Sequence, residues 1–453
     1  MRELVHLSAI HFPIPSMKTK HSPRPPLGWN SYDCFGSAVT EKEVCENAAF
    51  MAANLKGWGW EYVVVDFCWS HPSPGACANP NIGHGCTPLL HTDLNGRLIP
   101  APNRFPSSAG GMGFKPLADY VHGLGLKFGI HVMRGIPKQV CTDHVPIEGS
   151  EYNTIEASTS LLECTWLDHM LTVNTKHPAG QAYYDSLFRL YAAWGVDFVK
   201  VDDILADGSD RGLGPYHASE VEAIRLAIER CGRPMVLSLS PGDASVATAG
   251  HLSEYADMWR MSADFWDDWK KLKRMFGLCE RWWGHRVPGA WPDADMLPLG
   301  RICKRGPKTP ERNSRFTESE QRVLLSLWSI FRSPLMLGGH LPETSLYTIG
   351  LLKNKEVMDV NQLCLGGRPV AGMDSAAPVW VSRYPDSADQ AVALFNLGES
   401  AHSFSVSLKD LDATGASLLT NLWTGETGSI MKETLEVSVP PHDVCFLRLA
   451  VRP

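Results

Sequence analysis

Short apolar runs alternate with longer amphipathic stretches from about residue 26 to about residue 340. The runs are almost continuously apolar, which is typical of parallel strands covered on both faces. There are eight of them: Leu27–Asn30, Tyr62–Trp69, Leu126–Val132, Asp197–Asp202, Met235–Ser240, Asp257–Ser262, Pro288–Asp293 and Pro334–Gly338.

The amphipathic stretches between these runs have helical spacing. In the first of them, Thr40 and Glu43 form a capping box. Six stretches have this character: Glu41–Lys56, Lys115–His122, Gly180–Trp194, His217–Arg230, Asp264–Trp282 and Thr317–Phe331. Eight strand–helix units predict an α/β fold, a closed (β/α)8 TIM barrel over residues 25–364. No Gly-rich GxGxxG motif follows the first run, which disfavours an open dinucleotide-binding sheet.

The pattern changes to period two near residue 365. Short alternating runs separated by turns are typical of an antiparallel β-sandwich, and we expect about seven strands over residues 365–453. Residues 1–24 are basic and Pro-rich and are predicted to form a loose arm. The alternating runs are Pro369–Ser382, Gln390–Leu397, Ala401–Leu408, Ala416–Leu422 and Thr434–Val451.

The charge and the lengths of the apolar stretches exclude some classes of binding partner. The chain has 42 Lys+Arg and 49 Asp+Glu, a net charge of −7, which argues against nucleic acid. No apolar stretch reaches the roughly 18–20 residues that span a membrane, so no membrane partner is expected. The chain shows no signal-peptide pattern and no Asn-x-Ser/Thr sequon, which predicts a cytoplasmic rather than a secreted protein. Cys77 and Cys86 flank a loop and could pair only in an oxidising compartment.

Polar residues follow most of the apolar runs. In a barrel, catalytic side chains lie at the carboxyl ends of the strands, so these residues should form one cup. A single strand-end aspartate is most often a helix N-cap, but acids or bases end five of seven runs. The residues are Trp29 and Asn30, Asp66, His131, Lys200 and Asp202, Ser238 and Ser240, Arg260 and Asp264, and Asp293 and Asp295.

A cup of carboxylates and indoles without His/Cys metal spacing suits cleavage of a glycosidic bond. That reaction needs one carboxylate to stay ionised and one carboxylic acid to keep its proton. Lys200 points the same way as Asp202 along a strand and should keep it ionised. Asp264 has Trp259, Phe265 and Trp266 close in sequence and should be desolvated. Tryptophan is frequent, with 15 residues, and Trp29 is the candidate that would stack on a sugar.

Five segments resemble motifs of glycoside hydrolase family 27, which contains α-galactosidases and α-N-acetylgalactosaminidases. The resemblance implies a barrel with a C-terminal β-domain, a retaining double displacement on an oligosaccharide or glycoconjugate, and neither metal nor cofactor. It implies Asp202 as nucleophile and Asp264 as acid/base, with Trp29, Asp66, Lys200, Arg260 and Asp295 lining the sugar pocket. The segments are Leu27-Gly-Trp-Asn-Ser-Tyr32, Tyr62-Val-Val-Val-Asp66, Phe198-Val-Lys-Val-Asp202, Trp259-Arg-Met-Ser-Ala-Asp264 and Trp291-Pro-Asp-Ala-Asp-Met-Leu297.

Three positions depart from the family pattern and bear on the sugar. Phe67 replaces the second of two aspartates that hold O4 and O6 of galactose, His131 replaces a tyrosine-bearing motif, and Ser240 lies in Ser-Leu-Ser-Pro-Gly instead of Cys-Glu-Trp. We expect hydrolysis of terminal α-galactosides. The small Ser240 leaves an α-N-acetylgalactosaminidase open, and Phe67 leaves an α-glucan-directed, isomaltose-releasing enzyme open. A carbohydrate-binding protein without catalysis and a metal-dependent enzyme are the alternatives from other classes.

Overall fold

The computed structural model describes residues 21–74, 90–161, 163–164, 169–205, 215–240, 242–305 and 310–451. Residues 1–20, most of the expected N-terminal arm, and the Cys77–Cys86 pair lie outside this part of the chain. Within it, no helix is long and apolar enough to span a membrane.

All eight expected barrel strands are present and parallel. A parallel bridge between Leu297, which follows the seventh strand, and Leu337 in the eighth joins the two ends of the sheet. The TIM-barrel prediction is therefore confirmed. In sheet order the strands are β10 (Trp291–Asp293), β9 (Met258–Arg260), β8 (Val236–Leu239), β7 (Phe198–Asp202), β3 (Lys127–Met133), β2 (Tyr62–Val65), β1 (Leu27–Asn30) and β13 (Leu335–Leu337).

Helices cover the outside of the sheet. Thr40 and Glu43 form the expected capping box at the start of α2. Helix α9 begins later than expected, at Trp269, because the Asp268 side chain accepts hydrogen bonds from the backbone N–H groups of Lys270 and Lys271. Asp264 therefore lies in the loop before the helix. The longer helices are α2 (Glu41–Asn54), α4 (Lys115–Gly123), α6 (Pro178–Trp194), α7 (Ala218–Arg230), α9 (Trp269–Trp282), α10 (Glu318–Phe331) and α12 (Lys355–Leu363).

Shorter elements fill the connections. The segment between β3 and β7 carries α5 (Lys138–Thr142) and a small sheet of order β4-β6-β5. Short helices in the described ranges also include α1 (Tyr32–Phe35), α8 (Ala249–Tyr255) and α11 (Leu346–Leu352). The small sheet consists of β4 (Ile136–Pro137), β5 (Ser158–Thr159) and β6 (Met170–Val173).

Side chains along each strand point alternately into and out of the barrel, and this alternation decides which residues line its inside. Gly28 faces inward, where a Cβ would lie only 2.5 Å from the Tyr62 carbonyl oxygen. Its neighbours Leu27 and Trp29 face outward and pack in the core between strands and helices. The inner layer contains Tyr62, Val64, Phe198, Val236, Met258, Trp291 and Met336.

The C-terminal domain is an antiparallel β-sandwich, as expected. The described residues give it eight strands rather than about seven: the Pro369–Ser382 and Thr434–Val451 runs each divide into two strands, and β19 lies between the expected runs. One sheet has the order β14-β15-β16-β21-β18-β19 and the other pairs β17 with β20. The strands are β14 (Arg368–Ala371), β15 (Val379–Arg383), β16 (Gln390–Asn396), β17 (His402–Ser407), β18 (Ala416–Asn421), β19 (Thr427–Ser429), β20 (Thr434–Val439) and β21 (Asp443–Val451).

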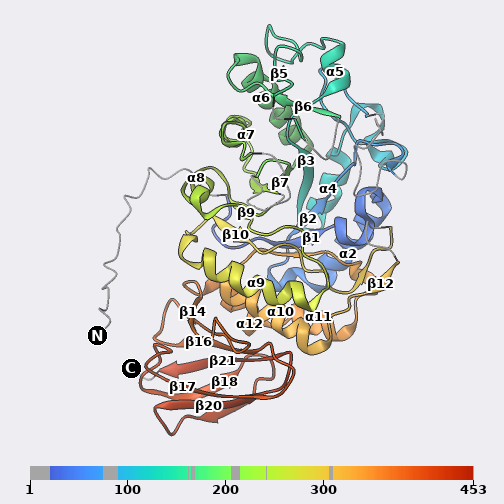
Figure 1. Cartoon of the computed structure of the whole chain (residues 1–453). Helices are drawn as coiled ribbons and strands as arrows, with labels where there is room; N and C mark the ends of the chain where they lie inside the picture. Colours follow the sequence, from blue (N-terminus) through green and yellow to red (C-terminus); the bar gives the residue numbers. More distant parts are fainter. Residues whose placement is uncertain are drawn as a thin grey trace.

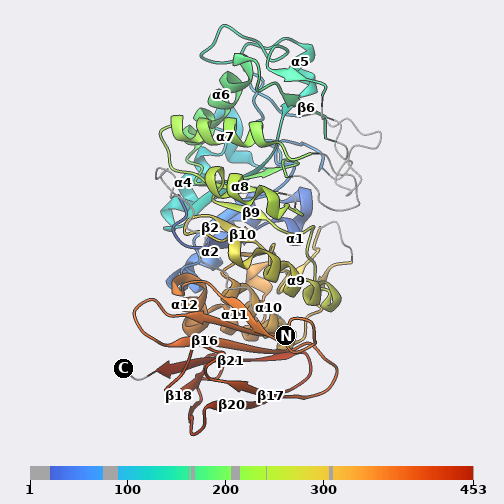
Figure 2. The same ribbon diagram turned by 60° about the vertical axis from the view of Figure 1, so that its left-hand side comes forward.

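The sandwich lies against helices α10, α11 and α12 of the barrel (Figure 1), and the same arrangement is visible after rotation (Figure 2). Aromatic pairs cross the boundary: Phe276 with Phe395, at 4.9 Å between ring centroids, and Phe331 with Trp380. Helix α10 is buried along nearly its whole length. One continuous hydrophobic core therefore joins the two domains.

Candidate active site

The carboxyl ends of β2, β3 and β7 bring one half of the expected cup together. His131 Nε2 donates a hydrogen bond of 2.9 Å to Oδ2 of the Asp202 carboxylate, and the backbone N–H of Asp203 donates to Oδ1 of the same carboxylate. Burial raises the pKa of Asp202, but the hydrogen bond with His131 and the charges of His131 and Lys200 outweigh it, so the pKa lies below its usual value. The expected role of Lys200 is thus shared with His131.

Asp66 forms a second, deeper cluster beside this pair. Its Oδ2 accepts hydrogen bonds from Asn30 at 2.6 Å and from Lys200 at 2.9 Å, and its Oδ1 accepts the N–H of Phe67. Burial opposes ionisation of Asp66, but Lys200 holds its pKa well below the ordinary range. The pKa of Lys200 is raised in return, although burial lowers it, because Asp66 and Asp202 both face it. The cluster is an ion pair locked in its charged form.

Arg134, just beyond β3, braces the backbone behind Asp202. Its guanidinium donates to the Asp203 carbonyl at 2.5 Å, and it forms ion pairs with the Asp203 carboxylate at 2.9 Å and with Glu220 at 3.2 Å. Asp203 has φ of 59°, a left-handed conformation that costs energy for a non-glycine residue. Arg134 therefore stabilises the turn that aims the Asp203 N–H at Asp202.

The opposite half of the cup is built around Arg260 at the end of β9. One guanidinium nitrogen lies 2.7 Å from Oδ1 of Asp295, and another lies 3.1 Å from Oδ1 of Asp264. The Asp264 side chain is 64% exposed. The expectation that Asp264 is desolvated by neighbouring aromatics is wrong in this structure, because Trp259 and Phe265 turn into the core.

Asp293 and Asp295 close the cup from β10. Both oxygens of Asp295 are held, Oδ2 by the N–H of Phe265 at 2.7 Å and Oδ1 by that of Met296 at 2.7 Å. Burial raises the pKa of Asp295, and Arg260 opposes that rise. Burial also raises the pKa of Asp293 to about 7, again against the charge of Arg260. This half therefore holds carboxyls that burial drives toward the protonated form.

Two residues missed at the sequence level lie beside the cup. The Lys200 ammonium lies over the Tyr32 ring, 5.8 Å from its centroid. Burial raises the pKa of Tyr32, and so do the charges of Asp264, Asp66 and Asp202. Asp33 is fully buried, and its Oδ2 has no hydrogen-bond partner in the part of the chain that the structure describes. Tyr32 ends the first of the segments that resemble the family, but neither residue ends a strand; they follow the first strand by two and three residues.

Trp29 is not available as a stacking surface. It has no exposed area, its indole N–H donates to the Gly339 carbonyl at 2.8 Å, and its ring packs edge-on against Phe35. The physical reason is the strand alternation, which turns Trp29 outward and sends Asn30 into the cup. The prediction of a sugar-stacking Trp29 is therefore corrected, and Asn30 replaces it as the residue of β1 that faces the site.

Phe67 and Ser240, two of the departures from the family pattern, are both at the cup. Phe67 is 8% exposed and lies edge-on to His131, with 5.3 Å between ring centroids. Ser240 is 1% exposed, and within the described ranges its hydroxyl has no hydrogen-bond partner. In the described part of the chain, no group of three or more His, Cys, Asp or Glu side chains is placed to hold a metal ion.

Comparison with known proteins adds family information to this geometry. Residues 161–363 match the family model described as alpha galactosidase A, and residues 374–449 match the alpha galactosidase C-terminal beta sandwich domain. Alpha-galactosidase A of Cellvibrio japonicus is 29% identical, over 94% of this chain and 92% of its own length. Alpha-galactosidase 2 of Arabidopsis thaliana is 26% identical, over 92% and 87%.

Two solved structures are more similar in sequence. A GH27 β-L-arabinopyranosidase from Geobacillus stearothermophilus is 46% identical with a TM-score of 0.88, covering 95% of this chain and 97% of the other. A putative α-N-acetylgalactosaminidase from Bacillus halodurans is 41% identical with a TM-score of 0.83, covering 94% and 97%. The relatives thus share one fold but carry names with three different sugars.

Proposed function

Because this chain belongs to glycoside hydrolase family 27, the α-galactosidase family, we propose that it is a retaining exo-glycosidase acting through Asp202 and Asp264. Asp202 attacks the anomeric carbon while Asp264 gives its proton to the departing glycosidic oxygen. The Asp264 carboxylate then takes a proton from water, and that water displaces Asp202 from the sugar. The sugar leaves with its original anomeric configuration.

The observation that carries this assignment is the contrast between the two carboxylates. Asp202 is held ionised by His131 and Lys200, as a nucleophile requires. Asp264 touches Arg260 but is otherwise open to solvent, so it can exchange a proton with water. A carbohydrate-binding protein would not need either arrangement.

Phe67 indicates the sugar. Where the family pattern has an aspartate for O4 and O6 of galactose, this chain has an apolar ring packed on His131. β-L-Arabinopyranose has the ring configuration of α-D-galactose but lacks the C6 hydroxymethyl group, so it has no O6 that needs a partner. We therefore propose terminal β-L-arabinopyranose as the preferred sugar and α-D-galactose as a slower substrate. The sugar named for the Geobacillus relative agrees with this choice.

Ser240 favours a second candidate. Its small side chain, at the end of β8, leaves space where other family members have a larger residue, and its hydroxyl has no partner among the described residues. An N-acetyl group at C2 could fill that space and accept this hydrogen bond. The candidate is therefore an α-N-acetylgalactosaminidase.

A panel of four p-nitrophenyl glycosides tests the assignment: the β-L-arabinopyranoside, the α-D-galactoside, the N-acetyl-α-D-galactosaminide and the α-isomaltoside. We expect the highest kcat/KM on the first. A highest value on the galactosaminide would instead establish the second candidate, and a highest value on the isomaltoside would reject both.

Substitution at Phe67 sharpens the choice of sugar. Phe67→Asp should raise the galactoside to arabinopyranoside ratio of kcat/KM by about 10- to 100-fold, because a carboxylate can bind O6. Phe67→Leu, which keeps an apolar side chain, is the matched control and should leave the ratio near that of the parent. An unchanged ratio in Phe67→Asp would contradict the role given to Phe67.

A further inference from the structure

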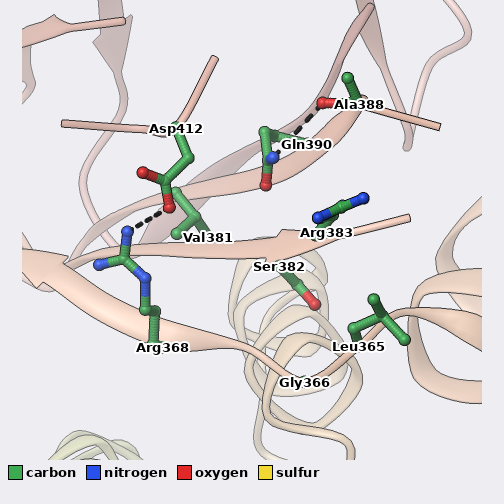
Figure 3. Close-up of a pocket in the computed structure, with 9 residues that line it drawn as sticks. All are labelled: Leu365, Gly366, Arg368, Val381, Ser382, Arg383, Ala388, Gln390 and Asp412. Carbon is green, nitrogen blue, oxygen red and sulfur yellow. Dashed lines mark hydrogen bonds and ion pairs between the residues drawn. The ribbon is translucent and has the colours of Figure 1, made fainter. Parts of the chain in front are cut away.

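Two cavities lie in the C-terminal part of the molecule, away from the catalytic cup. The first has a volume of about 410 Å³ and is shown in Figure 3. No aromatic ring lines it, and its charged groups are Arg383 and the Arg368–Asp412 ion pair, which leaves an excess positive charge. The second, which we call the seam cavity, has a volume of about 390 Å³ and differs in both respects.

The seam cavity lies where the sandwich meets the barrel. Its walls come from α10 and α11 on one side and from the ends of β18, β20 and β21 on the other. Trp423 and Tyr347, both half-buried, supply two aromatic rings. The indole N–H of Trp423 donates to the Ser326 hydroxyl at 2.9 Å, and the Tyr347 hydroxyl donates to the Glu318 carbonyl at 3.0 Å. Both rings are therefore anchored through their polar atoms.

The polar groups of the seam cavity balance in charge. Arg322 forms a two-pronged pair with Asp443, at 3.2 and 2.7 Å, and donates to the Tyr347 hydroxyl at 2.7 Å. These are the charged side chains that line this cavity, so it has no excess charge that would select an anion or a cation. The pairing also fixes the planar groups in place before any ligand arrives.

Asn421 leaves a hydrogen-bonding group open at the rim. Its Oδ1 accepts the backbone N–H groups of Trp423 and Thr424, at 2.9 and 3.2 Å, and this orients the amide. Among the residues that the structure describes, the Asn421 Nδ2 has no acceptor. Ser438 adds an exposed hydroxyl at the same rim, and the exposed Thr424 hydroxyl there is bonded to Glu426 at 3.2 Å. The cavity thus offers aromatic faces together with uncharged donors and acceptors.

We propose that the seam cavity is a non-catalytic binding site for a neutral oligosaccharide chain. Anchored aromatic rings beside neutral and paired polar groups suit the mixed apolar and hydroxylated faces of a pyranose, and the volume lies within the roughly 300–1,000 Å³ of ligand pockets. The choice of carbohydrate as the ligand rests on the proposed function. A second attachment point would raise the effective concentration of a polymeric substrate at the catalytic cup without changing the chemistry there.

Native gel electrophoresis in gels that contain neutral arabinogalactan or galactomannan tests this site directly. We expect the full chain to be retarded, Trp423→Ala to lose at least most of that retardation, and Trp58→Ala, which removes an exposed tryptophan elsewhere, to keep it. Ser438→Arg changes an exposed rim position and should also abolish retardation, because the longer side chain fills the cavity without removing a core contact. Polygalacturonate, an anionic polymer, should retard none of these proteins.

Two further measurements separate this proposal from the proposed function. Lys200→Ala alters the catalytic cup and should be retarded like the parent. Trp423→Ala and Ser438→Arg should keep kcat/KM on the preferred aryl glycoside within about twofold while losing about three- to tenfold on the polymer. If no glycoside of the panel is hydrolysed, the gel result can still be interpreted, because it measures binding of the polymer and not turnover. The proposal is overturned if the parent is not retarded, if Trp423→Ala and Ser438→Arg migrate like the parent, or if Lys200→Ala alone abolishes retardation.

Discussion

The two halves of the catalytic cup solve opposite problems. On one half, Asp202 is 17% exposed and is bound by a nearly buried His131, with Lys200 facing it. On the other half, Asp264 is 64% exposed and Arg260 is its one ion-pair partner among the described residues. In the proposed mechanism Asp202 must stay ionised and needs fixed partners, whereas Asp264 gives and regains a proton in each turnover and needs access to water. Of these two carboxylates, Asp202 is therefore the one with buried polar partners.

The largest effect is expected for Asp202, the one of these two carboxylates with more fixed partners. Asp202→Ala should lower kcat by a factor on the order of 10⁴ or more, because no other group can form the covalent intermediate. Azide can enter the space left by the carboxylate and attack the sugar from that face, so it should restore turnover and give a glycosyl azide of inverted configuration. NMR of the product measures this. A retained azide would contradict the assignment of Asp202.

Asp264→Ala should lower kcat/KM by about 10²- to 10⁴-fold on poor leaving groups, because these need a proton. Aryl glycosides with acidic phenols should lose far less. Azide should here attack the glycosyl-enzyme from the opposite face and give the retained glycosyl azide. Equal losses on good and poor leaving groups would show that Asp264 is not the acid. The same azide anomer from Asp202→Ala and Asp264→Ala would show that the two carboxylates do not have different roles.

His131→Gln tests whether the hydrogen bond to Asp202 sets the acidic limb of activity. In the proposed mechanism activity needs ionised Asp202, so it is expected to be lost as pH falls through the lowered pKa of this carboxyl. Removing His131 takes away the main lowering cause, so the acidic limb of kcat/KM should move to higher pH, with a loss of roughly 10- to 100-fold at acidic pH.

A matched pair serves as the control for this variant. His122 Nε2 lies 2.7 Å from Oδ2 of Asp197. Asp197 immediately precedes β7, so this pair is at the opposite end of the strand from Asp202 and away from the cup. His122→Gln should leave the pH profile in place. A profile that moves equally in both variants would mean that the change reflects folding rather than the nucleophile.

The smallest expected effect concerns stability on the Arg260 side. Burial raises the pKa of Asp293 to about 7, so this carboxyl favours the folded state when protonated and costs stability as pH rises from about 4 to 7. Asp293→Asn keeps an oxygen for the Asp295 N–H and removes that cost. We expect its Tm at pH 8 to exceed that of the parent by about 2–4 °C, with little difference at pH 4.

Asp66→Asn gives the contrast from the other half. The pKa of Asp66 is lowered, so its charged form stabilises the fold above its ordinary pKa, and this contribution is lost as pH falls. Its replacement should lower Tm at pH 8. A gain in Tm for both variants, or for neither, would show that the two halves do not differ in the way their buried acids titrate.

The sequence predicts the architecture well because each strand is marked by an apolar run, and such a run can be recognised without knowing which strands it pairs with. The strand-end rule likewise brings Asp66, Lys200 and Asp202 to one place, since parallel strands end at one rim. It is less reliable for side-chain direction. Strand β1 is buried on both faces, so its four residues show no alternation that would reveal Trp29 as outward and Asn30 as inward.

The surroundings of single side chains could not be predicted in the same way. Asp264 has aromatic neighbours in sequence, but Trp259 and Phe265 are directed into the core by the strand and the loop, which leaves the carboxylate exposed. Tyr32 and Asp33 follow the first strand rather than end it, so a rule based on strand ends passes over them. Proximity in sequence is a poor guide to desolvation wherever the chain leaves a strand.

The buried helix α10 limits how this enzyme can be taken apart. A fragment that stops before residue 365 would expose the surface of α10 that now contacts the sandwich, including the ring of Phe331 that packs on Trp380. Such a fragment is expected to aggregate rather than act as a minimal catalyst. Chimeras that exchange the C-terminal domain between relatives should therefore carry α10 with it, so that the unit of recombination begins at Glu318 and not at the first strand of the sandwich.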